Sequence, residues 1–222
     1  MKRLHNIDSL KLLCAVLVIF IHVHTSYQEY IMPLVRCAVP CFLIISGYLI
    51  FTEDVMKLEG HLKRSTSKIF HILVWSTLLF ASVKFIFAFK SGDFSFLSLN
   101  AFGKFILLNE NPFGFHLWYI GAYLYTLIIV HFSVKYNKLK YIWFSVPFLL
   151  LLDLCLGKYS LVLWHKEFPY IWVRNFLCVG IPYFCIGMLL RKLKEQILEI
   201  KHLRILAFGG GNFVFVNIYY RK

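Results

Sequence analysis

The chain has 222 residues, of which 59% are hydrophobic, 18% aromatic and 16% charged. A charged fraction well below the usual quarter or so excludes an ordinary water-soluble domain, because a core of this size cannot bury so much apolar surface. The net charge of +13 is compatible with nucleic-acid binding, but the basic residues lie in short segments between apolar runs and form no nucleic-acid motif. The composition therefore predicts a protein in the lipid bilayer with no nucleic acid partner.

The amino terminus resembles a signal peptide in its basic start and its long apolar run. It lacks a small-x-small cleavage site, however, and His22 and His24 interrupt the end of the apolar run. We therefore expect a retained first helix.

Seven apolar runs predict membrane-spanning helices, since about 20 residues of helix cross about 30 Å of hydrocarbon. They are residues 9–27, 35–51, 69–89, 116–134, 141–157, 170–190 and 205–220. The expected fold is all-α, a polytopic membrane helical bundle of about seven transmembrane helices in a single domain over residues 1–222.

The orientation follows from the lysines and arginines between these runs, because cytoplasmic loops carry the excess. An inside amino terminus puts 14 of them in inner segments and 4 in outer loops. The outer four are Lys90, Lys104, Lys158 and Lys166. We therefore expect a cytoplasmic amino terminus in a multi-pass protein of the inner (plasma) membrane.

Two connecting segments carry functional hypotheses. Residues 90–115 are aromatic and amphipathic but have no apolar run long enough to span, which favours an interfacial segment or a cover over a cavity. The basic stretch from Lys57 to Lys68 is either a loop that obeys the positive-inside rule or a surface complementary to a cytosolic polyphosphate donor.

Ionisable side chains inside spans are costly, and each is therefore a candidate functional residue. The set comprises Lys11, His22, His24, Arg36, Lys84, Asp153 and Arg174. The six cysteines have no metal-ligand spacing and mostly lie in apolar runs, so we expect small buried hydrophobes and no metal.

Lys11 and His22 are eleven residues apart, close to three helical turns, so both project from one face of the first helix with about 16 Å of rise between them. An imidazole there is suited to general acid-base chemistry. Alternatively, Lys11 reaches the inner headgroups and His22 bonds a neighbouring helix. Asp8 either pairs with Lys11 or interacts with the helix dipole.

Four motifs in order resemble the acyltransferase-3 family of integral-membrane acyltransferases, which modify cell-surface glycans and related acceptors in bacteria. The segment NIDSLKLLCAVLVIFIH is similar to the family's opening pattern of Asp, two residues, Arg or Lys, ten residues and His. Asp8, Lys11 and His22 occupy these three positions. The other three are RCAVPCFLIISGYLIF with Arg36, HLWYIGAYLYTLIIV with His116 and Trp118, and VRNFLCVGIPYFCIGMLL with Arg174. The resemblance covers residues 1–190.

This resemblance implies transfer of an acyl group, commonly acetyl from cytosolic acetyl-CoA, to a hydroxyl of a surface glycan or a lipid-linked sugar. It implies that His22 is the catalytic histidine, with Lys11 and Asp8 as its companions in the motif. The other motif residues would contact the substrate or CoA: Arg36, His116, Trp118 and Arg174. So would Arg64 and Lys68 at the basic start of the third span. The family shows Arg-x-x-Arg there, whereas this chain has Ser65 and Lys68 at the two Arg positions and Arg64 one position earlier. The implied substrates and partners are acyl-CoA, the acceptor and the bilayer, with no bound cofactor.

The chain is shorter than most family members, which have about ten spans, so it looks shortened at its carboxyl end. One alternative is therefore an inactive scaffold fragment without the last spans. Another is a transporter of lipid-linked sugars, which would require inverted helical repeats that the sequence does not show.

Overall fold

The computed structural model describes the backbone of residues 5–22 and 28–199, which is helical and contains no strand over these ranges. The α-helices are α1 (His5–His22), α2 (Gln28–Arg36), α3 (Ala38–Ile50), α4 (Val55–Ser91), α5 (Leu99–Leu108), α6 (Trp118–Lys135), α7 (Leu139–Asp153), α8 (Ser160–Trp164), α9 (Ile181–Lys192) and α10 (Lys194–Glu199). Short 3-10 or π segments are η1 (Ser95–Leu97), η2 (Phe115–Leu117), η3 (Leu154–Lys158), η4 (Tyr170–Trp172) and η5 (Phe176–Gly180). The all-α prediction is confirmed for this part of the chain.

Among the residues that the structure describes, four segments are long and apolar enough to cross a membrane: Tyr30–Ile50, Val55–Ser91, Phe115–Lys135 and Leu139–Gly157. They overlap the predicted spans 35–51, 69–89, 116–134 and 141–157. Several apolar helices of spanning length make this a membrane protein.

The other three predicted spans have different outcomes. Span 205–220 lies outside the described residues, as does the end of span 9–27. Span 170–190 is not one continuous helix, because η4 is followed by turns, a π-helix begins only at Phe176 and the α-helix begins at Ile181. Seven spans and a cytoplasmic amino terminus therefore stay predictions.

Helix α4 corrects the interpretation of Lys57–Lys68 as a loop. The helix has 37 residues and begins at Asp54, whose carboxylate accepts a hydrogen bond from the backbone N–H of Lys57 at 3.2 Å. This backbone hydrogen bond lowers the pKa of Asp54, with the Lys57 ammonium at 3.1 Å adding to the effect. At about 1.5 Å per residue α4 is about 55 Å long, so its basic start extends beyond about 30 Å of hydrocarbon.

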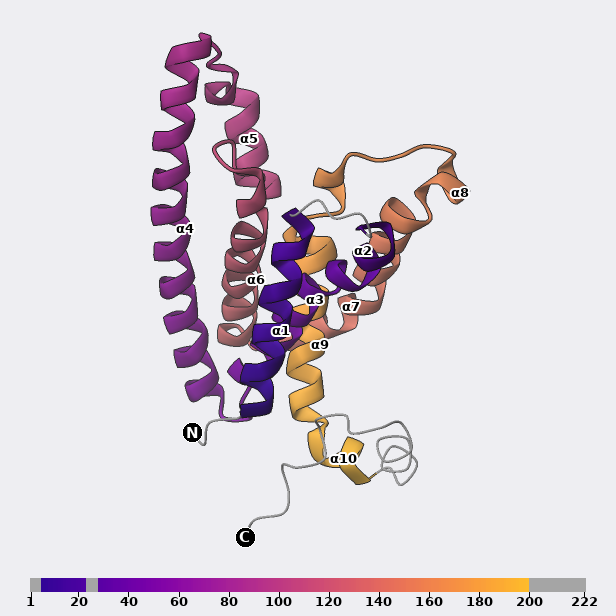
Figure 1. Ribbon diagram of the computed structural model, residues 1–222. Coiled ribbons are helices and arrows are strands. Elements are labelled where there is room, and N and C mark those ends of the chain that lie inside the picture. Colours follow the sequence, from indigo (N-terminus) through magenta and orange to yellow (C-terminus); the bar gives the residue numbers. More distant parts are fainter. Residues whose placement is uncertain (1–4, 23–27, 200–222) are drawn as a thin grey trace.

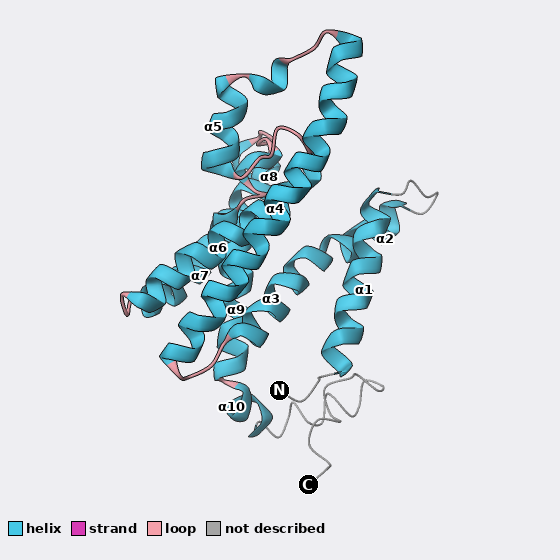
Figure 2. Ribbon diagram, turned by 90° about the vertical axis from the view of Figure 1, so that its left-hand side faces the viewer, coloured by secondary structure: helices cyan, strands magenta, loops and turns pink. Residues whose placement is uncertain are grey.

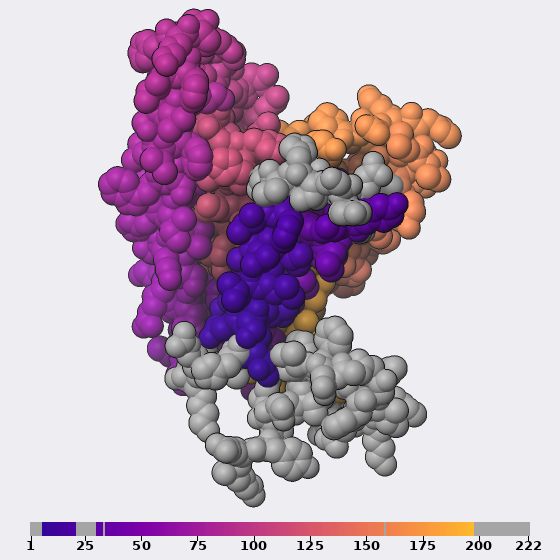
Figure 3. Space-filling model, viewed as in Figure 1, coloured from indigo at the N-terminus to yellow at the C-terminus, as the bar shows by residue number. Residues whose placement is uncertain are grey.

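The helices form a bundle with α4 along one side and α5 beside its upper end (Figure 1). Turning the molecule by 90° places α1 and α2 on one side and α6 and α7 on the other, with α3 and α9 between them (Figure 2). Helix α1 contacts α2 and α3, and it lies on the outer surface of the bundle in space-filling view (Figure 3). The apolar core gathers side chains from α4, α6, α7 and α9, among them Leu62, Leu127 and Phe184, which are fully buried.

Helices α3 and α9 approach closely because a glycine faces the backbone at each side of their contact. A Cβ on Gly47 would collide with the carbonyl oxygen of Phe184, and a Cβ on Gly187 would collide with the carbonyl oxygen of Ile44. Small residues allow such approach in membranes, where association depends on close packing instead of the hydrophobic effect. The Ser-Gly pair in the second motif thus has a packing function.

We predict that Gly47→Ala and Gly187→Ala each destabilise the protein by about 1–3 kcal/mol, the usual cost of overpacking. Thermal unfolding in detergent measures the effect as a lowered Tm. Gly60→Ala is the matched control, because nothing lies within 4 Å of a Cβ at this helical position, and alanine is favoured there by about 0.5–1 kcal/mol. An unchanged Tm in both test variants would contradict the close contact.

Candidate functional site

The predicted catalytic face begins with an ion pair on α1. Lys11 Nζ lies 4.0 Å from Asp8 Oδ1, and both side chains are roughly half-exposed, at 39% and 47%. Of the two alternatives for Asp8, pairing with Lys11 is therefore seen. Such an exposed pair contributes little to stability, but it orients the ammonium along α1.

The buried side of α1 lies next to the helix face that carries Lys11. Cys14, about 60° around the helix from Lys11, is 2% exposed and contacts the side chain of Cys41 in α3. On the other side of α1, Leu12 and Ile19 are about 60% exposed or more. His22 is the last residue of α1, and its side chain lies outside the described part of the chain.

Two tyrosines of α6 complete this region, and sequence reasoning missed both. The rings of Tyr119 and Tyr123 stack with 6.3 Å between centroids and an interplanar angle of 18°. Tyr119 contacts Phe42 of α3 and lies within electrostatic range of Cys14 of α1, while the Tyr123 hydroxyl meets the side chain of Ser46. Helices α1, α3 and α6 thus bring a thiol and three hydroxyls together beside the Lys11 face.

The signal for these tyrosines was their spacing. Residues four apart share a helix face, so two hydroxyl-bearing aromatics in HLWYIGAYLYT mark one side of α6 as polar. Nothing in the sequence indicates that α3 supplies the opposite wall.

Asn109 fixes the start of α6, which carries the third motif. It is 1% exposed and has φ of 55°, the left-handed conformation that asparagine tolerates at a helix end. Its Nδ2 donates to the carbonyl of Trp118 at 3.1 Å, and its Oδ1 accepts from the backbone N–H of Phe176 at 3.1 Å. One amide therefore joins the end of α5 to α6 and to η5.

The loop between α5 and α6 is attached to α4. Lys84 Nζ donates to the carbonyl of Pro112 at 2.6 Å and lies 5.1 Å from the centroid of the Phe96 ring. Asn111 Nδ2 donates to the Thr77 hydroxyl at 2.7 Å. These contacts satisfy the ammonium of Lys84, one of the ionisable groups expected to need a partner in the membrane.

His116 and Trp118 have different surroundings. The exposed His116 ring meets Phe80 of α4 edge-on, with centroids 4.3 Å apart. Trp118 is half-buried, and its carbonyl accepts the Asn109 hydrogen bond. The structure therefore packs His116 against α4 and ties Trp118 to the end of α5.

Arg36 and Arg174 are brought within electrostatic range of each other although 138 positions separate them. Arg174 is half-buried and its guanidinium lies 4.4 Å from the centroid of the Tyr170 ring. The next residue, Asn175, caps η5 by accepting from the N–H groups of Leu177 and Cys178. The Arg-Asn pair of the fourth motif therefore combines a cation with a helix start.

Arg64 and Lys68 are exposed on one face of α4, four residues apart. They lie in the basic first part of the helix, and neither is joined to the Lys11 face by a contact among the described residues. No cluster of three or more His, Cys, Asp or Glu side chains suited to a metal ion occurs in the described part of the chain.

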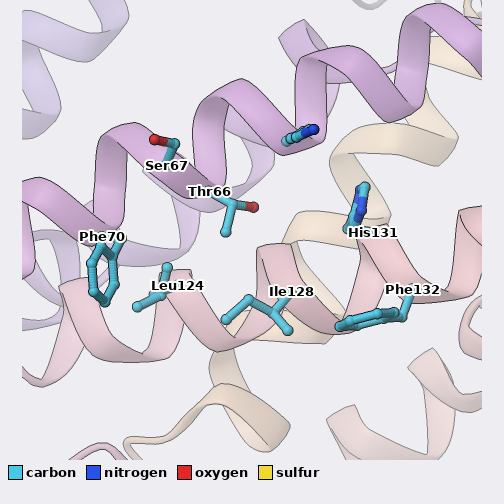
Figure 4. Close-up of a pocket in the computed structure, with 8 residues that line it drawn as sticks. Thr66, Ser67, Phe70, Leu124, Ile128, His131 and Phe132 are labelled. Atoms are coloured by element: carbon cyan, nitrogen blue, oxygen red, sulfur yellow. The ribbon is translucent and has the colours of Figure 1, made fainter.

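A cavity of about 360 Å³ lies between α4 and α6 (Figure 4). Its lining residues are Lys63, Thr66, Ser67, Phe70, Leu124, Ile128, His131 and Phe132. None of the predicted site residues lines this cavity, which adjoins α6 instead of α1.

We predict that Asn109→Ala destabilises the protein by about 2 kcal/mol or more, because two buried backbone groups lose their partner at about 1–3 kcal/mol each. Thermal unfolding in detergent measures the effect. Asn100→Ala, at an exposed position of α5, leaves the Tm within 1 °C or so. Equal Tm values for the two variants would contradict the bridging role of Asn109.

The spanning helices and the buried asparagine contacts define a helical membrane protein with short connections. The chain matches the sequence model of the acyltransferase-3 family, an acyltransferase domain, over residues 4–221. It therefore belongs to this family and is an acyltransferase. The match continues past residue 190, where the motif resemblance ends. No curated protein and no solved structure matches the chain significantly.

Proposed function

We propose that the protein transfers an acyl group, with acetyl as the representative case, from cytosolic acyl-CoA to a hydroxyl of a cell-surface glycan or lipid-linked sugar at the inner (plasma) membrane. The observation that carries the proposal is the polar line on α1. Lys11 lies on it, about 60° around the helix from Cys14, which is buried against α3, and the spacing of eleven residues predicts His22 on the same face. A helix that presents an ammonium and an imidazole beside other helices is suited to proton transfer in a low-dielectric region.

In the proposed reaction His22 accepts the proton of the acceptor hydroxyl while that oxygen attacks the thioester carbonyl. The new oxygen–carbon bond forms and the carbon–sulfur bond breaks, so CoA leaves as a thiolate and takes up the proton from the imidazolium. Lys11 lies about three turns closer to the amino terminus than His22, and Asp8 is its ion-pair partner. Under the predicted orientation Lys11 is on the cytosolic side, and His22 is on the outer side with the acceptor.

The other motif residues support contacts with the two substrates. Exposed Arg64 and Lys68 provide positive charge for the CoA phosphates at the start of α4. Arg36 and Arg174 provide a second basic region next to the start of η5. These assignments rest on the family's reaction and on the placement of the residues.

The test supplies membranes containing the protein with radiolabelled acetyl-CoA and candidate glycan acceptors. His22→Ala should lower transfer by about 10²–10⁴-fold, the usual contribution of a general base. His71→Ala is the matched control, because His71 is exposed on α4 and its ring bonds only the carbonyl of Ser67 among the described residues. Transfer that survives His22→Ala unchanged would rule out the assigned role.

The tyrosine pair gives a separate prediction. Tyr119→Phe keeps the ring stacking and removes one hydroxyl next to the Lys11 face, so we expect kcat to fall by about tenfold, equivalent to about 1.4 kcal/mol. Tyr141→Phe, at a 61% exposed position of α7, should leave kcat unchanged. If both variants transfer acetyl at the wild-type rate, the α6 hydroxyl has no part in catalysis.

A further inference from the structure

The cavity between α4 and α6 is separate from the proposed catalytic face. His61 of α4 is hydrogen-bonded to the carbonyl of Ile50 at the end of α3, at 3.2 Å, so this side of α4 faces α3. Lys63 follows two residues later, about 200° around the helix, and lines the cavity. The cavity therefore opens on the side of α4 that is turned away from α3, whereas α1 packs against α2 and α3.

The wall that α4 contributes to this cavity changes from polar to apolar along the helix. Its lining runs from Lys63 through Thr66 and Ser67 to Phe70, seven residues and about 10 Å apart. On α6, which runs antiparallel, His131 lies beside Phe132 at the Lys63 end, and Ile128 and Leu124 follow toward the Phe70 end. Figure 4 shows His131 and Phe132 at one end, Thr66 in the middle and Phe70 beside Leu124 at the other end. This gradient matches a ligand with a polar head and a hydrocarbon tail.

The polar end offers hydrogen-bonding and charged groups for a ligand. His131 Nδ1 is buried and makes no hydrogen bond with any described residue. A buried polar atom without a partner is costly, so a ligand oxygen at this place would be stabilising. The exposed Lys63 ammonium forms no ion pair within the described ranges. A phosphate is the group that satisfies both an ammonium and an imidazole.

We propose that this cavity binds one glycerophospholipid with an anionic headgroup. Its phosphate contacts Lys63 and His131, and one acyl chain lies along Phe70, Leu124 and Ile128. The surrounding charge is complementary, since Lys135 and Lys138 follow the same end of α6. Basic pockets between transmembrane helices are known lipid headgroup sites, and the volume of about 360 Å³ lies in the range of about 300–1,000 Å³ of small-molecule sites.

The experiment is native mass spectrometry of the full chain purified in detergent. The protein is offered equal amounts of phosphatidylglycerol and phosphatidylcholine with identical acyl chains, and the ratio of bound lipids is measured. Wild-type protein should retain phosphatidylglycerol at least tenfold better. Lys63→Ala combined with His131→Phe should reduce this preference to threefold or less, and Ile128→Trp should reduce binding of both lipids by filling the apolar end.

Lys140→Ala is the matched control, because it removes an exposed lysine in the first turn of α7, outside the cavity. It should retain the wild-type preference, and each variant should melt within a few degrees of wild type. Lys63→Gln, a conservative exposed change, serves if the double variant does not fold. Equal retention of the two lipids by wild type would overturn the proposal. So would displacement of bound phosphatidylglycerol by coenzyme A, which would make the cavity part of the donor site, or a dimer that Ile128→Trp abolishes.

Discussion

The backbone contact between α3 and α9 is the constraint on which the rest of the structure depends. Gly47 and Gly187 each face a carbonyl oxygen of the other helix, so neither helix can move away without losing dense packing on both sides. Helix α3 carries α1 and α2 on its other side, and α9 shares the apolar core with α4, α6 and α7. The candidate catalytic helix α1 is therefore positioned through α3.

A second constraint acts where α5, α6 and η5 meet, since polar groups there need partners because hydrocarbon supplies none. Asn109 and Asn175 satisfy backbone groups of α6 and η5, and Lys84 satisfies a loop carbonyl. These contacts fix the register of α6 and with it the two tyrosines that face α1 and α3. The α3–α9 contact and these hydrogen bonds therefore both position the side of the bundle next to the Lys11 face.

Sequence patterns predicted the apolar elements well, because hydrocarbon thickness sets a length that can be counted. Of the two interpretations of Lys57 to Lys68, the loop is wrong, because a helix longer than the membrane carries these basic residues beyond the hydrocarbon, whereas the surface for a polyphosphate donor stays a prediction. The segment 170–190 looked continuous by hydropathy, but helix begins only after Asn175, whose amide caps η5. The mean hydropathy of a segment does not reveal where a side chain caps a helix.

Long-range contacts were out of reach of the sequence. The four motifs named Arg36 and Arg174, yet only the fold brings them into electrostatic range. The same holds for Tyr119 beside Cys14, since periodicity gives the face of one helix and says nothing about which helix lies opposite. Periodicity predicted that Lys11 and His22 share one face of α1, which stays a prediction, and the structure adds that Cys14, about 60° around the helix from Lys11, is buried.

The central claim is that the Lys11–His22 line of α1 borders a hydrated chamber inside the bundle. The most direct measurement is labelling of single cysteines by a charged, membrane-impermeant thiosulfonate in a cysteine-free background. A cysteine at position 22 should react at least tenfold faster than one at position 13, where Leu13 is exposed on the opposite side of the helix, and acyl-CoA should slow the reaction. Equal rates at the two positions, with no effect of acyl-CoA, would contradict the account.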